Sequence, residues 1–247
     1  MKRFRLIRSP EADAISNMAL DEKIFHRYTE DGIPAFRIYG WESASFTCGI
    51  SQSPENDIDI KLCAQDGIGI AKRMTGGGVL FHHNEITYSL VCAKEDIREP
   101  DGVFVSYRKI CAFLISFYRS LGLDASFALE REDFKARSLQ HELCSASREK
   151  YDIVINGRKI GGNAQKRKAR AVFQHGSIPI SIDWAFMRRY LPSLPEDISS
   201  GVTTLAEELR RVPDKRILED MLIDAAAKEF NAQFIEEESP YEAVMAK

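Results

Sequence analysis

The order of short apolar strands and longer amphipathic helices is the feature that most limits what this chain can fold into. Segments that alternate with a period of two come in succession, and only a few segments with helical periodicity separate them. Strands are expected at residues 3–8, 34–39, 45–50, 68–73, 79–82, 87–92, 151–155, 158–160 and 171–180, and helices at 12–28, 59–64, 103–121, 184–190 and 214–230. Because strands and helices do not alternate regularly, this order predicts an α+β fold with a mixed sheet.

Local signals sharpen this outline. The segment 103–121 carries the clearest helical apolar face of the chain. Asn156-Gly157 lies between two apolar runs and is a strong signal for a tight hairpin turn. The runs 79–82 and 87–92 are close enough in sequence to predict a second hairpin. Residues 130–150 are charged and aperiodic, which predicts a mobile loop.

Length and composition are those of an ordinary globular protein. A chain of 247 residues with 44% hydrophobic and 29% charged residues can bury a sizeable core. We expect one domain over residues 1–247, with a helical C-terminal portion from about residue 184. The net charge of -3 gives no overall attraction to nucleic acid, and no apolar run has the length of a membrane span. Neither nucleic acid nor a membrane is therefore an expected partner.

The cysteines indicate a reducing compartment. The chain has five, an odd number, and none of them forms a CxxC pair. A disulfide framework or a thiolate zinc site is therefore not expected, and no metal site is predicted. The N-terminal residues are basic but lack an apolar core of signal-peptide length. These features predict a cytoplasmic protein.

A glycine-rich segment at residues 72–79 is the first candidate for chemistry. Gly76, Gly77 and Gly78 are consecutive, so a ligand can approach the backbone N–H groups without meeting side chains. Arg73 brings a planar cation to the same segment. The spacing fits neither a P-loop nor a dinucleotide fingerprint. Taken alone, the segment is equally consistent with a flexible turn.

A second candidate is the segment 156–165, which contains Lys159. Lys159 lies in a predicted strand between a tight turn and the pair Gly161-Gly162. The glycines indicate that something packs close to the backbone here. An ammonium group at this position can neutralise a carboxylate, a phosphate or a developing oxyanion. The alternative is a solvated surface lysine.

Basic residues and a histidine follow. The run contains no acidic residue and consists of Arg158, Lys159, Lys166, Arg167, Lys168 and Arg170. Such a run is a solvated face, a surface that steers an acidic partner, or a site for nucleotide phosphates. His175, in the next predicted strand, is either a buried hydrogen-bonded histidine or part of the same site.

Together these segments resemble the signatures of lipoate–protein ligase A and its relatives. Residues 73–82, Arg-Met-Thr-Gly-Gly-Gly-Val-Leu-Phe-His, are similar to the Arg-x-x-Gly-Gly-Gly-x-x-x-His pattern of that family. Residues 157–165 resemble its second signature, which holds an essential lysine, and residues 174–178 resemble the third. Segments 17–21 and 37–41 are similar to its N-terminal helix and an early strand. Several signatures in the same order and spacing are hard to obtain by chance.

The resemblance implies a fold and a set of roles. The fold is the catalytic domain of biotin and lipoate ligases, related to class II aminoacyl-tRNA synthetases, with a mixed, largely antiparallel sheet flanked by helices. An apolar tunnel would hold the acyl chain, and burying the seven carbons of an octanoyl tail would contribute about 5 kcal/mol. Lys159 would bind and polarise the acyl carbonyl or its phosphate. The residues implied in substrate binding are Arg73, Gly76, Gly77, Gly78, His82, Gly161, Gly162, Asn163 and His175; for His82 the sequence indicates no specific role.

Two reactions occur on this fold, and Cys144 bears on the choice between them. An octanoyltransferase passes the acyl group from an acyl carrier protein through an enzyme thioester, without a cofactor. A lipoate ligase uses ATP and Mg²⁺ to form lipoyl-AMP. Cys144 lies seven residues before Tyr151, similar to the nucleophile of one octanoyltransferase group. However, Ser145-Ala146-Ser147 differs from that group, and Tyr151-Asp152 is closer to the ligases.

The resemblance also implies the partners. The acceptor would be a lysine of a lipoyl-domain protein, either the glycine cleavage H protein or a dehydrogenase E2 subunit, and the substrate would be lipoate or octanoate. We expect the Cys144 transferase, with the ATP-dependent ligase as the alternative. A non-catalytic acyl-binding protein is a lesser alternative, because both Lys159 and the triple glycine are present.

Overall fold

A six-stranded mixed sheet forms the centre of the molecule. The computed structural model describes residues 1–97, 103–131, 151–168 and 171–239. The sheet has the order β10 (Gly162–Lys168), β11 (Ala171–Pro179), β6 (Glu85–Ala93), β2 (Ala35–Tyr39), β1 (Lys2–Arg8) and β13 (Ala232–Glu237). β1 is parallel to β2 and β13, and the remaining pairs are antiparallel. The predicted mixed α+β fold is confirmed.

Two smaller sheets accompany the large sheet. The three-stranded sheet has the order β4 (Gly69–Lys72), β3 (Ser45–Cys48) and β5 (Leu80–His82). The four-stranded sheet has the order β12 (Val202–Thr203), β9 (Arg158–Ile160), β8 (Ile153–Ile155) and β7 (Ala125–Phe127). β8 and β9 form the hairpin predicted from the Asn-Gly turn, and Asn156 there has a φ of 50°.

The second predicted hairpin is wrong. β5 pairs with β3 in the small sheet, whereas β6 pairs with β2 and β11 in the large one. The difference lies in burial: the residues of β6 from Glu85 to Cys92 are all buried, so that strand belongs at the centre of a sheet covered on both faces.

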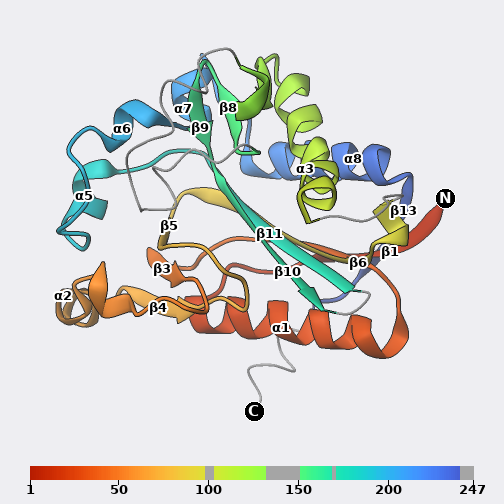
Figure 1. The fold of residues 1–247 in the computed structure, drawn as a ribbon, viewed down its shortest axis with the longest axis horizontal. Coiled ribbons are helices and arrows are strands. Elements are labelled where there is room, and N and C mark those ends of the chain that lie inside the picture. Colours follow the sequence, from red (N-terminus) through yellow and green to blue (C-terminus); the bar gives the residue numbers. More distant parts are fainter. Residues whose placement is uncertain (98–102, 132–150, 169–170, 240–247) are drawn as a thin grey trace.

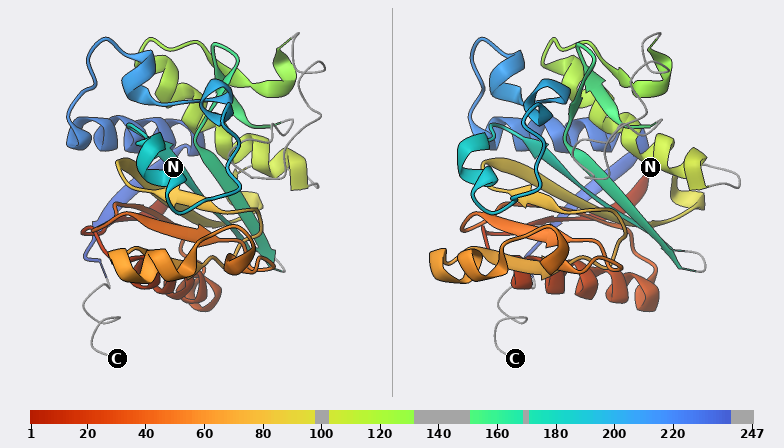
Figure 2. Two further views of the ribbon diagram at one scale, coloured as in Figure 1. Left: turned by 90° about the vertical axis from the view of Figure 1, so that its left-hand side faces the viewer. Right: turned by 60° about the vertical axis from the view of Figure 1, so that its left-hand side comes forward.

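Three long helices cover the large sheet. α1 (Ala14–Asp31) lies on one face, and α3 (Val103–Ser120) and α8 (Lys215–Phe230) pack together on the other (Figures 1 and 2). Asp13 caps α1 by accepting hydrogen bonds from the N–H groups of Ile15 and Ser16, and Gly32 ends the helix with a φ of 68°. Local signals of this kind explain why these helices could be predicted.

The other helices in the described part of the chain are short. They are α2 (Ile60–Asp66), α5 (Trp184–Arg188), α6 (Ile198–Gly201), α7 (Leu205–Glu208) and the 3₁₀ turns η1 (Pro54–Asn56), η2 (Glu95–Ile97) and η3 (Ala128–Glu130). α2 and α5 pack on the three-stranded sheet through a separate apolar cluster that includes Phe46, Cys63 and Met187. No helix in the described part of the chain is long and apolar enough to cross a membrane.

Four strands were not expected from the sequence. They are β7, β10, β12 and β13. β10 is rich in polar and basic residues and joins the sheet by pairing along its whole length with residues 171–177 of β11. β13 pairs with β1 over six residues, so the portion after residue 184 contains strands as well as helices. The predicted loop at 130–150 lies, from residue 132 onward, outside the described residues.

Candidate functional site

The glycine-rich loop between β4 and β5 is shaped by Arg73. The guanidinium group of Arg73 is buried, and Nη1 donates to the carbonyl oxygen of Thr47 at 2.7 Å. Nη2 donates to the carbonyl oxygens of Gly76 at 3.1 Å and Gly78 at 2.8 Å. These contacts direct the loop carbonyls inward, towards the cation. Arg73 therefore holds the loop in shape, whatever it contributes to a ligand.

The three glycines of the loop have different structural roles. Gly77 has a φ of 97°, a conformation that side-chain-bearing residues rarely adopt. Its carbonyl oxygen also lies only 1.9 Å from where a Cβ on Gly49 would be, so the two backbones touch. A Cβ on Gly76 would meet no heavy atom within 4 Å. Gly76 is thus the position where a missing side chain leaves open space beside the loop.

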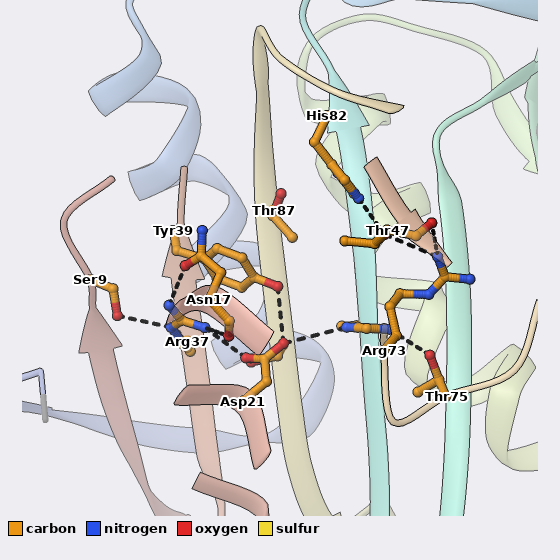
Figure 3. A network of polar contacts seen from close by, with 12 residues as sticks. Ser9, Asn17, Asp21, Arg37, Tyr39, Thr47, Arg73, Thr75, His82 and Thr87 are labelled. Atoms are coloured by element: carbon orange, nitrogen blue, oxygen red, sulfur yellow. Dashed lines mark hydrogen bonds and ion pairs between the residues drawn. The ribbon is translucent and has the colours of Figure 1, made fainter. Parts of the chain in front are cut away.

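His82 is fixed by polar partners on both ring nitrogens. Nε2 lies 2.7 Å from Thr47 Oγ1, and Nδ1 lies 2.8 Å from Glu85 Oε1. The Trp41 ring stacks on the imidazole with centroids 3.9 Å apart, and Trp41 Nε1 donates to Glu85 Oε1 at 3.1 Å. Burial raises the pKa of Glu85, but His82 and the hydrogen bonds to the carboxylate outweigh burial and lower that pKa overall. Thr47 links His82 to Arg73, as Figure 3 shows.

A buried carboxylate, Asp21 of α1, organises the other side of the loop. Asp21 accepts hydrogen bonds from Arg37 at 2.8 Å and from Tyr39 at 3.0 Å, as Figure 3 shows. It also accepts one from Ser89 at 2.7 Å. Burial raises its pKa, but Arg37 and His175 outweigh burial, so the pKa lies below its ordinary value. A fully buried charge of this kind is tolerated because its oxygens have several donors.

His175 connects Asp21 to the glycine loop. Its Nδ1 lies 3.4 Å from Asp21 Oδ2, and its Nε2 lies 2.7 Å from Thr75 Oγ1. Burial lowers the pKa of His175 despite the neighbouring carboxylate, which keeps the ring neutral near pH 7. A neutral ring that donates from Nδ1 to Asp21 accepts a hydrogen bond from the Thr75 hydroxyl at Nε2. The loop is thereby tied to β11.

Two cavities lie between these elements. The smaller, of about 10 Å³, is bordered by Trp41, Arg73, His82 and His175. The larger, of about 60 Å³, lies between the glycine loop end of β5 and α5, and its wall includes Gly161, Gly162 and Val202. Of the predicted binding residues, Arg73, His82 and His175 line the smaller cavity, and Gly161 and Gly162 line the larger. Four others line neither cavity; they are Gly76, Gly77, Gly78 and Asn163.

Lys159 forms a buried ion pair. Its Nζ is 3.0 Å from Asp152 Oδ2, and both side chains are less than a tenth exposed. Lys159 pairs in register with Val202 of β12, so the two side chains extend from the same face of that sheet. Since Val202 lines the larger cavity, Lys159 belongs to the face turned towards it. The solvated-lysine alternative does not fit this burial.

The residues after Lys159 are constrained by close packing. Gly161 has a φ of 70°, and a Cβ there would come within 2.0 Å of the Ser177 carbonyl oxygen. Asn163 Oδ1 accepts a hydrogen bond from Tyr88 at 2.8 Å, and a Cβ on Gly176 would lie 2.0 Å from the same oxygen. Gly161 and Asn163 therefore help to hold β10 against β11, in addition to any contact with a ligand.

The basic run is divided by the fold. Arg158 pairs with Glu207 and Glu208 on α7, and Lys159 pairs with Asp152. The cations of the run that remain lie on β10, which is the edge strand of the large sheet; they are Lys166, Arg167 and Lys168. Arg170 lies outside the described residues.

Cys144 also lies outside the described residues, so its predicted place beside Lys159 stays a prediction. The four cysteines of the described part are all buried; they are Cys48, Cys63, Cys92 and Cys111. Burial raises the pKa of the Cys63 thiol to about 11 and those of Cys92 and Cys111 to about 12, and it also raises that of Cys48. In the described ranges, no three histidine, cysteine or acidic side chains come together as metal ligands.

Sequence reasoning missed Asp21 and Glu85 as organising residues. A signal for Asp21 was present, because Asn17 and Asp21 lie one helical turn apart on the face that also carries Leu20 and Ile24. Polar residues on the buried face of a helix need hydrogen-bond partners, and here Arg37 supplies them.

The sequence matches the family model of the lipoyl protein ligase A/B catalytic domain over residues 13–231. This chain belongs to that family. Similar curated proteins are octanoyltransferases LipM, at 35% identity in Bacillus subtilis (strain 168) and at 29% in Clostridioides difficile (strain 630). The first alignment covers 73% of this chain and 66% of the relative, just under two thirds of its length. The second covers 100% of this chain and 94% of the relative.

Solved structures of the family share the fold. A lipoate-protein ligase A bound with ATP superposes with a TM-score of 0.79 at 22% identity, covering 99% of this chain and 93% of that one. A putative lipoate protein ligase from T. acidophilum with bound lipoic acid gives a TM-score of 0.78 at 21% identity with the same coverage. The predicted family and its catalytic-domain fold are both confirmed.

Proposed function

We propose that this protein transfers an octanoyl group to a specific lysine of a lipoyl-domain protein through a thioester on Cys144. The observation that carries the proposal is the similarity to proteins named octanoyltransferase, in one case over 100% of this chain. The donor is an octanoyl acyl carrier protein, and the acceptor is a glycine cleavage H protein or a dehydrogenase E2 subunit.

The reaction proceeds by two acyl transfers. The Cys144 thiolate attacks the carbonyl carbon of the donor thioester, a new C–S bond forms, and the carrier thiolate leaves. The ε-amine of the acceptor lysine then attacks the enzyme thioester, the amide forms, the amine loses a proton, and the Cys144 thiolate is released. Lys159 extends from the same sheet face as Val202, which lines the larger cavity, and it stabilises the negative charge that develops on the carbonyl oxygen.

The chemistry of the cysteines supports Cys144 as the nucleophile. A thioester route needs a thiol that ionises readily, because the thiolate is the reactive form. The four described cysteines are buried, and burial raises the pKa of each. Cys144 is the remaining cysteine of the sequence.

The ATP-dependent ligase is the second candidate, favoured by the likeness in fold to a lipoate-protein ligase A bound with ATP. In that reaction Lys159 would contact the phosphate of lipoyl-AMP. Mg²⁺ bound with a nucleotide needs only one or two carboxylates. Asp152, the partner of Lys159, would be the carboxylate suited to it.

Mass spectrometry of the intact protein separates the two reactions. After incubation with octanoyl acyl carrier protein, we expect one added octanoyl mass that neutral hydroxylamine removes. Cys144→Ser should abolish this adduct, and the matched control Cys63→Ser, at a buried thiol, should keep it. Full activity of Cys144→Ser with lipoate and ATP, without an acylated enzyme, would instead identify a ligase.

A further inference from the structure

We propose that Leu80 is a gate between the two cavities and sets the length of the acyl chain that the protein accepts. This inference rests on the proposed function, because it concerns the acyl group of that reaction. Leu80 and Ser177 are the residues that line both cavities, so these two side chains stand between them. The positions of these two side chains therefore decide whether the two cavities can join into one continuous channel.

Neither cavity alone can hold an octanoyl chain. Their volumes are about 60 Å³ and about 10 Å³, whereas a cavity of about 150 Å³ is what the six carbons of benzene occupy in a protein core. An eight-carbon chain needs at least as much space. A side chain must therefore move before the acyl group enters.

Of the two shared residues, Leu80 is the one that can move. The Ser177 hydroxyl donates to Glu85 at 2.7 Å, and its strand is paired on both sides, with Gly162 of β10 and Thr87 of β6. Leu80 lies in the edge strand β5, and its side chain has only apolar contacts to lose. A rotamer change costs it no hydrogen bond.

Gly162 leaves room for this side chain. A Cβ on Gly162 would lie 3.3 Å from Leu80 Cδ2 and 3.9 Å from Cδ1, so the leucine methyl groups rest directly on the glycine backbone. The second glycine of the Gly161-Gly162 pair is therefore matched to Leu80. When Leu80 turns away from Gly162, the space that its methyl groups leave joins the two cavities.

The direction of the chain follows from what lies at each end. The larger cavity borders Gly161 and Val202, and Lys159 extends from the same sheet face as Val202, so the carbonyl end of the acyl group stays there. The smaller cavity is lined by Met18 and Trp41, neither of which lines the larger one. The tail of the chain therefore passes Leu80 and points towards Trp41.

The two tryptophans of the chain make this path measurable, because Trp184 lines the larger cavity and Trp41 the smaller. In a Trp184→Phe variant, Trp41 is the single fluorophore of this type. We expect 8-bromooctanoate, with bromine at the tail, to quench it several-fold more than 2-bromooctanoate does. Adding Leu80→Phe should reduce that quenching to the level of 2-bromooctanoate. Equal quenching by both acids in the Trp184→Phe variant that keeps Leu80 would overturn the proposed path.

Chain-length dependence of binding tests the gate itself. For saturated acids from hexanoate to tetradecanoate, each methylene should lower the Kd by about fourfold until the channel is full. The chain length at which this gain stops is the break in the series. Leu80→Ala removes three carbons, so we expect the break in this series to move to acids longer by about two or three carbons. Leu194→Ala, the same truncation in the apolar cluster beside α5 but lining neither cavity, should keep the wild-type break.

These measurements need no acyl transfer, so the two proposals fail separately. A break that stays in place in Leu80→Ala, in a protein that transfers octanoyl normally, would overturn the gate and leave the function intact. A break that moves, in a protein that transfers no octanoyl group, would overturn the function and leave the gate intact.

Discussion

At Lys159, the same ammonium group serves both stability and chemistry. It lies 3.0 Å from the Asp152 carboxylate, and both side chains are almost fully buried. Removing one member of a buried ion pair leaves an uncompensated charge, which typically costs about 3–5 kcal/mol. A solvated surface lysine, the alternative that the sequence left open, could be removed with little effect on folding, whereas a lysine in this buried ion pair cannot.

We therefore expect Lys159→Ala to abolish acyl transfer and also to lower the free energy of unfolding by about 3 kcal/mol or more. The double variant Lys159→Met with Asp152→Asn removes both charges, so it should recover most of that stability without recovering activity. Urea denaturation and a transfer assay on the same samples measure the two effects. Transfer at a near wild-type rate by the double variant would exclude Lys159 from the reaction.

His175 should make the stability of the protein depend on pH. Burial lowers its folded-state pKa below the ordinary 6.5, so the unfolded chain binds this proton more readily. Neutral His175 makes its full contribution to the free energy of unfolding above about pH 6.5. This contribution is lost as the pH falls towards the lowered pKa of His175. Asp21 keeps its charge in this window, because its own pKa lies below 3.8.

Accordingly, the free energy of unfolding should fall between about pH 7 and pH 5, by at most about 1.4 kcal/mol per pH unit from this one group. His175→Gln should remove that part of the slope. The control is His26→Gln at an exposed histidine of α1, which should keep the wild-type slope. Urea denaturation at several pH values measures this, and identical slopes for wild type and His175→Gln would contradict it.

At the scale of an element, the glycine loop combines a backbone position that needs glycine with one that has open space beside it. Gly77 has a φ of 97°, whereas a Cβ on Gly76 would point into open space. We expect Gly77→Ala to destabilise the protein by about 1–2 kcal/mol through backbone strain. Gly76→Ala should keep the melting temperature and weaken acyl-ligand binding, because a methyl group would occupy space beside the loop.

Thermal unfolding and fluorescence titration of both variants with octanoate separate these effects. If Gly76→Ala bound octanoate as the wild type does, the loop would be only a turn that Arg73 holds in shape.

The edge strand β10 is the second element with a testable role. Its cations lie on an open sheet edge, while Arg158 of β9 is already paired with Glu207 and Glu208. Changing Lys166, Arg167 and Lys168 together to Gln should raise the KM for an acidic lipoyl domain several-fold and reduce its dependence on salt.

Arg158→Gln removes the same kind of charge from a neutralised position and should leave that KM unchanged. Steady-state kinetics at two salt concentrations measure both variants. An unchanged KM for the acceptor, with weaker nucleotide binding, would instead assign the β10 cations to phosphates.

On the scale of the whole molecule, the two ends of the described chain meet in one sheet. β1 and β13 pair in parallel from Lys2↔Ala232 to Ile7↔Glu237. The Phe234 ring lies 5.8 Å from that of Phe4 and 5.4 Å from that of Phe36, so the last strand also packs into the core. The sheet that carries the site therefore depends on residues far from it in sequence.

Phe234→Ala should lower the free energy of unfolding by about 2–3 kcal/mol, somewhat less than for a fully buried phenylalanine. Gln233→Ala, at an exposed position of the same strand, is the control and should change it by less than about 0.5 kcal/mol. Urea denaturation measures both. Equal stability of the two variants would show that β13 adds no packing energy to the sheet.

The sequence by itself determined the elements and motifs whose signals are local. The helices α1, α3 and α8 follow from apolar periodicity, and α1 also has the capping residue Asp13. The β8–β9 hairpin follows from Asn156-Gly157. The signatures around Gly76 and Lys159 indicated the family. Each of these signals depends on residues within a few positions of one another.

Only the tertiary structure decided which distant segments meet. β5 pairs with β3 rather than β6, and the polar strand β10 exists because β11 supplies backbone partners for it. His175 reaches Asp21 across 154 residues of sequence. Hydrogen bonds between strands and the satisfaction of buried charges depend on neighbours in space, so no local pattern could specify them. The gate role of Leu80 likewise depends on a neighbour in space, because Gly162 packs against its methyl groups.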